Sequence, residues 1–84
     1  MDNFEDLSRS CKDALGKGQT LDALDRLWEL HTYVGNELHR EIRNLIRGKR
    51  EPEAYDTEAK RREINAHIEH LLLRCEKEYR EKAV

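Results

Sequence analysis

Apolar residues recur at helical spacing in four segments of the chain, and this periodicity constrains the fold more than any other feature. Intervals of three and four positions place the apolar residues of a segment on one face of a helix. The pattern predicts four amphipathic helices over about residues 3–15, 21–33, 37–48 and 57–81. Their apolar faces contain, in chain order, Phe4, Leu7, Cys11, Ala14 and Leu15; Leu21, Leu24, Leu27, Trp28, Leu30 and Val34; Leu38, Ile42, Leu45 and Ile46; and Ile64, Ile68, Leu71, Leu72, Cys75 and Tyr79.

Glycine, proline and a capping hydroxyl predict where these helices begin and end. Gly16 and Gly18 end the first helix, because glycine enters the left-handed conformation at little steric cost. Thr20 then offers a hydroxyl that can cap the second helix. Pro52 stops the third helix, and residues 49–56 form a loop. Short connections between four helices predict an all-α compact bundle, in which residues 1–84 form a single domain. Trp28 is predicted to anchor the core, because its large side chain favours burial.

The composition favours a cytoplasmic protein. The chain of 84 residues starts with an acidic segment that lacks an apolar run, so we expect no signal peptide. No stretch approaches the roughly 20 apolar residues that a membrane-spanning helix needs. Cys11 and Cys75 both fall on apolar faces, so we expect free, buried thiols in a reducing compartment.

Charge is arranged in alternating blocks, although 40% charged residues sum to a net charge of only −2. Residues 1–37 carry four basic and eight acidic side chains, whereas residues 38–50 carry five basic and one acidic. Opposite blocks of this kind permit electrostatic docking between two copies. The predicted contact joins a basic face on the third helix to an acidic patch on the second helix of another copy. The partner-binding candidates are Arg40, Arg43, Arg47 and Arg50, together with Asp22, Asp25 and Glu29.

No motif indicates catalysis, a cofactor or a metal. The segment GKGQT, residues 16–20, lacks the spacing and the preceding strand of a phosphate-binding loop. Four histidines and two cysteines do not form the paired ligands of a zinc site, even though His67 and His70 are one helical turn apart. Cys11 lies on an apolar face, where burial dulls thiol reactivity. We therefore expect no enzyme, no cofactor and no metal ion.

Two other functions remain open. The basic face could bind the phosphate backbone of nucleic acid, but Glu41 is close by and no aromatic residue is interleaved with the arginines. A small helical nucleic-acid-binding or regulatory protein is therefore the alternative to a protein-interaction domain. A third possibility is a small protein inhibitor that binds to a host enzyme and blocks it.

The turn between the first two helices resembles a signature of prokaryotic effector-associated domains. In that family a helix ends in a Lys-Gly-Lys-like turn and the next opens with a Glu-Ala-Leu-like run, as residues 14–24, ALGKGQTLDAL, do in similar form. Its last helix has a capping Ser or Thr, then Glu-Ala, an Asn and a Leu-Leu pair. The matching residues are Thr57, Glu58, Ala59, Asn65, Leu71 and Leu72. The chain departs from the family pattern at His67, where isoleucine is usual, and around Pro52, where a glycine is often found.

This resemblance implies a small non-catalytic adaptor, related in role to death-like domains and with a death-like or related helical bundle. Such modules associate with like domains. They link effectors, such as peptidases or TIR domains, to NTPase switches in bacterial immunity and programmed cell death.

Overall fold

A computed structural model describes residues 3–49 and 51–83 as an all-α protein. The prediction of four helices is confirmed, with boundaries that differ by a few residues. The main helices are α1 (Asn3–Gly16), α2 (Thr20–Leu30), α3 (Asn36–Lys49) and α4 (Glu58–Ala83). Two short 3₁₀ helices complete the chain: η1 (His31–Tyr33) takes the end of the predicted second helix, and η2 (Pro52–Tyr55) occupies part of the predicted loop.

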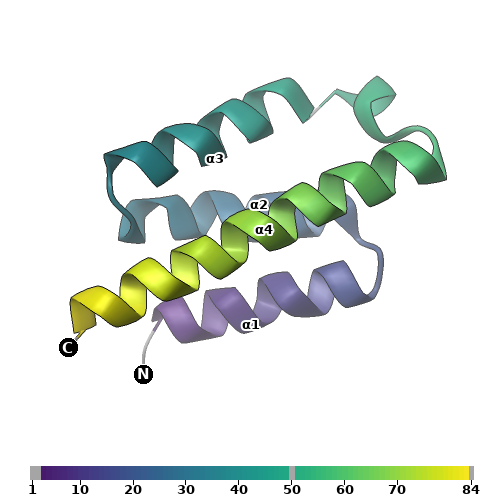
Figure 1. Ribbon diagram of the computed structural model, residues 1–84. Coiled ribbons are helices and arrows are strands. Elements are labelled where there is room, and N and C mark those ends of the chain that lie inside the picture. Colours follow the sequence, from purple (N-terminus) through teal and green to yellow (C-terminus); the bar gives the residue numbers. More distant parts are fainter. Residues whose placement is uncertain (1–2, 50, 84) are drawn as a thin grey trace.

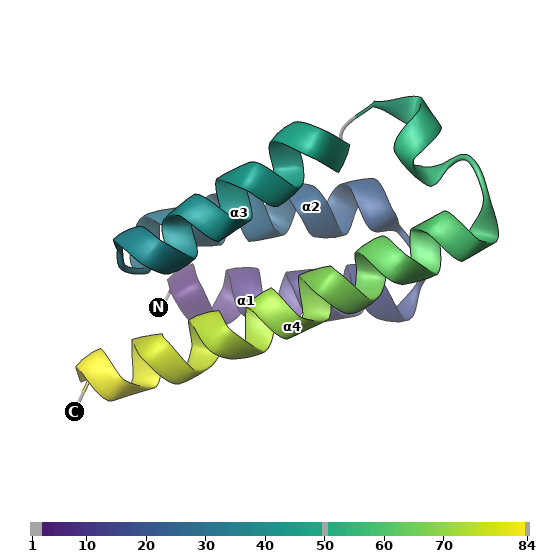
Figure 2. The ribbon, with the colours of Figure 1, turned by 45° about the horizontal axis from the view of Figure 1, so that its top comes forward.

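Successive helices run in opposite directions and form a flattened bundle (Figure 1). α2 and α4 contact each other in the middle, and α1 and α3 lie on opposite sides of this pair (Figures 1 and 2). α4 has 26 residues and is therefore ~39 Å long, close to the 41 Å length of the whole molecule. No helix in the described part of the chain is both long and apolar enough to cross a membrane.

The buried core follows the predicted apolar faces of α1, α3 and α4. All the predicted residues on α3 are buried, as are those on α4 except Tyr79, which is half-buried. α2 differs, because Trp28 is 40% exposed and Leu21 is 44% exposed. The prediction that Trp28 anchors the core is wrong. The buried face of α2 is centred on Leu27, and both Trp28 and Leu21 lie roughly 100–120° around the helix from it.

The turn between α1 and α2 satisfies the last carbonyl groups of α1 with backbone donors. The amide of Gln19 donates to the carbonyl oxygen of Ala14 at 2.9 Å, and that of Gly18 donates to Leu15 at 3.1 Å. Gly18 has a φ of 71°, the left-handed conformation that this helix ending requires. Gly16, in contrast, is still helical, so only Gly18 performs the role predicted for both glycines.

These two glycines provide a matched pair for a stability test. Gly18→Ala should lower the free energy of unfolding by about 1 kcal/mol, because a side chain disfavours positive φ. Gly16→Ala should raise it by roughly 0.5–1 kcal/mol, because alanine favours the helix and its Cβ would meet nothing within 4 Å. Urea denaturation followed by circular dichroism measures both changes, and equal effects in the two variants would contradict this assignment of the turn.

Thr20 does not cap α2 as predicted. The capping position belongs to Gln19, whose side chain makes no capping hydrogen bond. Thr20 is instead buried, and its hydroxyl donates to Oδ1 of Asn65 on α4 at 2.9 Å. The hydroxyl therefore ties the start of α2 to α4 rather than to its own helix.

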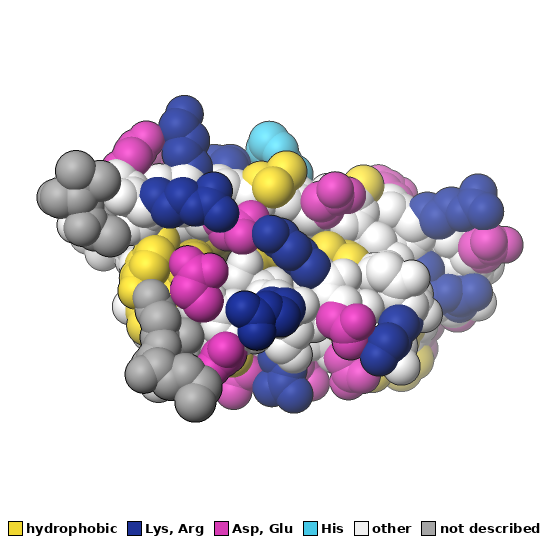
Figure 3. Space-filling model, turned by 90° about the horizontal axis from the view of Figure 1, so that it is seen from below, with side chains coloured by type: hydrophobic (Ala, Val, Ile, Leu, Met, Phe, Trp, Pro, Cys, Tyr) yellow, Lys and Arg dark blue, Asp and Glu magenta, His cyan; other side chains and the backbone are white. Residues whose placement is uncertain are grey.

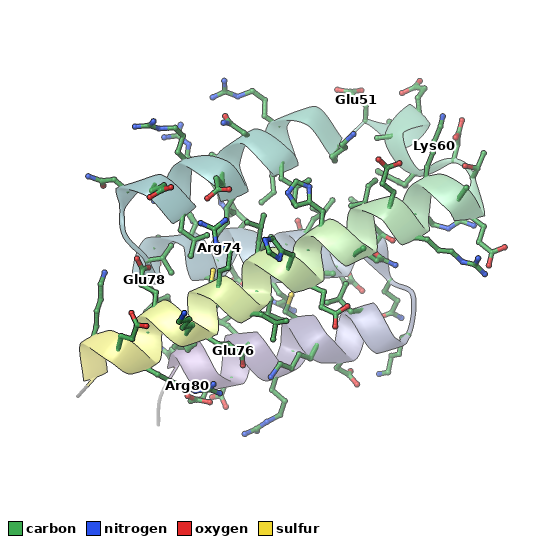
Figure 4. The ribbon with its side chains drawn as sticks, in the orientation of Figure 1. Glu51, Lys60, Arg74, Glu76, Glu78 and Arg80 are labelled. Atoms are coloured by element: carbon green, nitrogen blue, oxygen red, sulfur yellow. The ribbon has the colours of Figure 1, made fainter. Side chains whose placement is uncertain are left out.

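Polar contacts from one stretch of α4 reach three other parts of the bundle (Figure 4). Arg74 points toward α3 and donates from Nη1 to Oε1 of Glu41 at 2.9 Å. Glu76 points toward α1, where Oε2 accepts from Ser8 at 2.8 Å and from Lys12 at 2.7 Å. Two residues after Glu76, Glu78 accepts from the backbone amide of Gly35 at 2.8 Å. These contacts fix α4 against its neighbours on both sides.

An aromatic cluster closes the end of the bundle at which α1 begins. The rings of Phe4 and Tyr79 are stacked with centroids 3.9 Å apart. Tyr33, from η1, meets Phe4 edge-on at 5.7 Å and Tyr79 at 6.3 Å. The three rings join α1, η1 and α4 in an apolar contact that the helix periodicity did not predict.

Candidate functional site

The basic face predicted on the third helix lies on the outer side of α3. Arg40, Arg43 and Arg47 are all exposed, and their spacing places them on one side of the helix. Arg50, the fourth predicted residue, lies outside the described residues. A shallow hollow of about 380 Å³ runs along this face and is lined by Asn36, His39, Arg40, Arg43, Asn44 and Arg47.

The acidic patch predicted on the second helix is exposed on α2, but it is less acidic than expected. Asp22, Asp25 and Glu29 all face solvent. Arg26 lies among them and donates from Nη1 to Oε2 of Glu29 at 2.9 Å. This hydrogen bond, with smaller contributions from Asp22 and Asp25, raises the pKa of Arg26. The patch therefore carries one compensating cation that the prediction left out.

Trp28 lies at the junction between the two helices that carry these charges. Its indole borders a groove of about 290 Å³, lined also by Arg43, Ile46 and Arg47 of α3. The structure thus brings an aromatic side chain to the basic face, although none is interleaved with the arginines in the sequence. The available signal in the sequence was the position of Trp28 at the rim of the α2 apolar face, seven residues after another apolar residue at the same rim, Leu21.

Two histidines support the indole from the side away from the acidic patch. The rings of Trp28 and His31 are stacked with centroids 4.1 Å apart, and His31 meets His39 at 4.3 Å. His31 Nδ1 donates to the carbonyl oxygen of Trp28, and His39 Nδ1 donates to that of His31 at 3.1 Å. Trp28, His31 and His39 therefore form a continuous row of ring contacts from α2 to α3, stacked between Trp28 and His31 and tilted between His31 and His39.

The other groups that could carry chemistry are poorly placed for it. Cys11 and Cys75 are fully buried, and burial raises the pKa of each thiol to about 12. Neither is a thiolate near neutral pH, and the thiolate is the nucleophilic form. His67 and His70 are exposed on α4. Within residues 3–49 and 51–83, no group of three or more His, Cys, Asp or Glu residues could hold a metal ion.

The underside of the bundle, on which α1 lies, has a different surface character (Figure 3). Basic and acidic side chains alternate over this side, with small hydrophobic areas between them. Ion pairs such as Lys17 with Asp13, at 3.0 Å, explain part of this mixing. The separation of basic from acidic side chains across α2 and α3 therefore contrasts with this side of the molecule.

No protein-family model matches this chain, and no curated protein or solved structure matches it either.

Proposed function

We propose that this chain is a non-catalytic, homotypic protein-interaction module. The basic face of α3 docks on the acidic patch of α2 in a like domain. The observation that carries the proposal is the separation of charge on two neighbouring helices, with Arg40, Arg43 and Arg47 on α3 and Asp22, Asp25 and Glu29 on α2. Complementary charges of this kind raise the rate and the specificity of encounter between partners.

Within a cell, we place this module between an effector and its switch. The resemblance of residues 14–24 and 57–72 to effector-associated domains supports an adaptor, with a death-like bundle and a cytoplasmic location. Its partners would be like domains on a peptidase, a TIR protein or an NTPase of bacterial immunity. The bundle offers such partners an exposed charged surface on α2 and α3.

Reversing the charge of α3 should abolish most of the self-association. The variant Arg43→Glu with Arg47→Glu should associate more than about tenfold more weakly than the wild type at low salt, because two attractive contacts become repulsive. Sedimentation equilibrium over a series of salt concentrations measures this change. Wild-type association should also weaken as salt screens the exposed charges.

A second charge-reversed variant controls for net charge. Arg9→Glu with Arg62→Glu changes the net charge equally at two exposed positions, on α1 and at the start of α4. Its self-association should remain close to that of the wild type. A wild type that stays monomeric at high concentration and low salt would contradict the proposed function.

Binding of single-stranded nucleic acid is the second candidate function, favoured by Trp28 beside Arg43 and Arg47. Aromatic rings that stack on bases, flanked by cations, are typical of such sites. Fluorescence anisotropy of labelled DNA and RNA tests this candidate. Binding that weakens steeply with salt and is lost in Arg43→Glu with Arg47→Glu would support it.

A further inference from the structure

The exposed indole of Trp28 has a fixed position and an apolar neighbour. Its stack with His31 holds one side of the ring, and Ile46 packs at the floor of the adjoining groove. Leu21, 44% exposed, lies two helical turns earlier on the same side of α2. Leu21 and Trp28 therefore form an apolar strip along α2, called here the α2 strip.

The α2 strip separates the two charged surfaces. By helix geometry, Asp25, Glu29 and Asp22 lie roughly 60–120° around α2 from Trp28 on one side. His31 lies on the other side of Trp28 and contacts His39 of α3. The arginines of α3 lie beside His39, along the same hollow. Across the surface, the order is therefore acidic patch, apolar strip, basic face.

This order makes the surface complementary to itself. Rotation by 180° about an axis along the α2 strip places the acidic patch of one copy over the basic face of the other, twice in the same interface. The same rotation brings the two Trp28 side chains together at the axis. Trp28 lies beside Arg43 and Arg47 within one copy, and α2 and α3 run in opposite directions (Figure 1). The rotation therefore brings Glu29 toward Arg43 of the other copy, and Asp25 toward Arg47.

We propose that a second copy of this chain docks on the α2 strip in a closed, twofold-symmetric dimer, with Trp28 as its apolar anchor. This inference rests on the proposed function and adds the geometry and the anchor residue. Trp28 is suited to that role because large aromatic side chains near the centre of an interface contribute most to binding. The contact also requires Glu29 to exchange Arg26 of its own helix for an arginine of the partner.

Two variants with opposite charge reversals test the symmetry. The first carries Arg43→Glu with Arg47→Glu, and the second carries Asp25→Lys with Glu29→Lys. Each alone should fail to self-associate, because both of its contacts become repulsive. Mixed in equal amounts, they should form a complex of one chain of each kind, because both contacts are then attractive. Sedimentation equilibrium should give the mass of two chains and no more.

Replacing the anchor tests the role of Trp28. Trp28→Ala in both charge variants should weaken the mixed complex about 30-fold, the effect of losing a central aromatic residue. Leu21→Ala, a milder change on the same strip, should weaken it by a smaller factor. Leu73→Ala, an exposed apolar change on α4, should leave it unchanged. Circular dichroism confirms that each variant remains helical, and since Trp28 is the only tryptophan, its fluorescence emission should shift to shorter wavelength on mixing.

Several outcomes would overturn this inference. If the mixed charge variants form complexes larger than two chains, the association is head-to-tail. If the mixture stays monomeric while the wild type dimerises, the interface lies elsewhere on the molecule. If Trp28→Ala in the otherwise wild-type chain dimerises as strongly as the wild type, only the role of Trp28 as anchor is contradicted and the proposed function stands. A wild type that remains monomeric and binds oligonucleotides would contradict both.

Discussion

Leu71→Ala is expected to leave a large fraction of the molecules unfolded at 25 °C, whereas Leu73→Ala should leave the stability nearly unchanged. Leu71 is fully buried in the core, and Leu73, two residues later on α4, is 55% exposed. Removing a buried leucine side chain costs about 2.7–5 kcal/mol, which includes the cavity left behind. A core in a chain of this size supplies only about 3–5 kcal/mol in total. The loss at Leu71 is therefore comparable to the whole stability.

Leu73→Ala provides the matched control, since the chemical change and the helix are the same. Its effect should stay within roughly 0.5 kcal/mol, because little apolar surface is buried there and alanine is a good helix former. Urea denaturation followed by circular dichroism, or the thermal midpoint, distinguishes the two variants. Similar losses at both positions would mean that the assignment of the buried face of α4 is wrong.

Glu76→Gln should produce the second largest loss, and the size of that loss should depend on pH. Burial raises the pKa of Glu76, but hydrogen bonds from Lys12 and Ser8 outweigh it and hold the pKa below its ordinary value. At neutral pH the variant should lose about 1–3 kcal/mol, because a charged hydrogen-bonded contact between α1 and α4 becomes neutral.

The direction of the pH dependence follows from the lowered pKa of Glu76. The folded state favours the carboxylate, so its contribution is complete above the unfolded pKa of about 4.3 and is lost as the pH falls through the folded value. The difference in unfolding free energy between wild type and variant should therefore shrink at about pH 3. Glu69→Gln, an exposed change on the same helix, should show little difference at either pH. A gap that persists unchanged in acid would show that the carboxylate charge is not its cause.

Periodicity was sufficient to predict the four helices and most of the core. Every predicted apolar residue on α3 is buried, because an apolar face of that width is covered completely by α2 and α4. The same reasoning failed for Trp28, since the sequence shows which residues are apolar but not how far around α2 the neighbouring helices reach. An apolar residue at the edge of an apolar face can be buried in the core or exposed on the surface.

Contacts between distant parts of the chain were the other gap. Thr20 was predicted to cap the second helix because it directly precedes that helix in the sequence. Its hydrogen-bond partner is instead Asn65, which lies 45 residues later in the chain. In the candidate site, too, features within one helix could be predicted and contacts between helices could not. The exposure of Arg40, Arg43 and Arg47 followed from their spacing on one helix, whereas the approach of Trp28 to Arg43 depends on how α2 packs against α3.

Because α4 spans the length of the bundle, we expect the four helices to fold as a single cooperative unit. This helix contacts α1, α2 and α3, so none of them keeps a complete core when α4 detaches. Folding should therefore be close to all-or-none, as it is for most small single domains. The surface assembled from α2 and α3 is then either present in full or absent, and the proposed docking function would have a sharp threshold between competent and incompetent molecules.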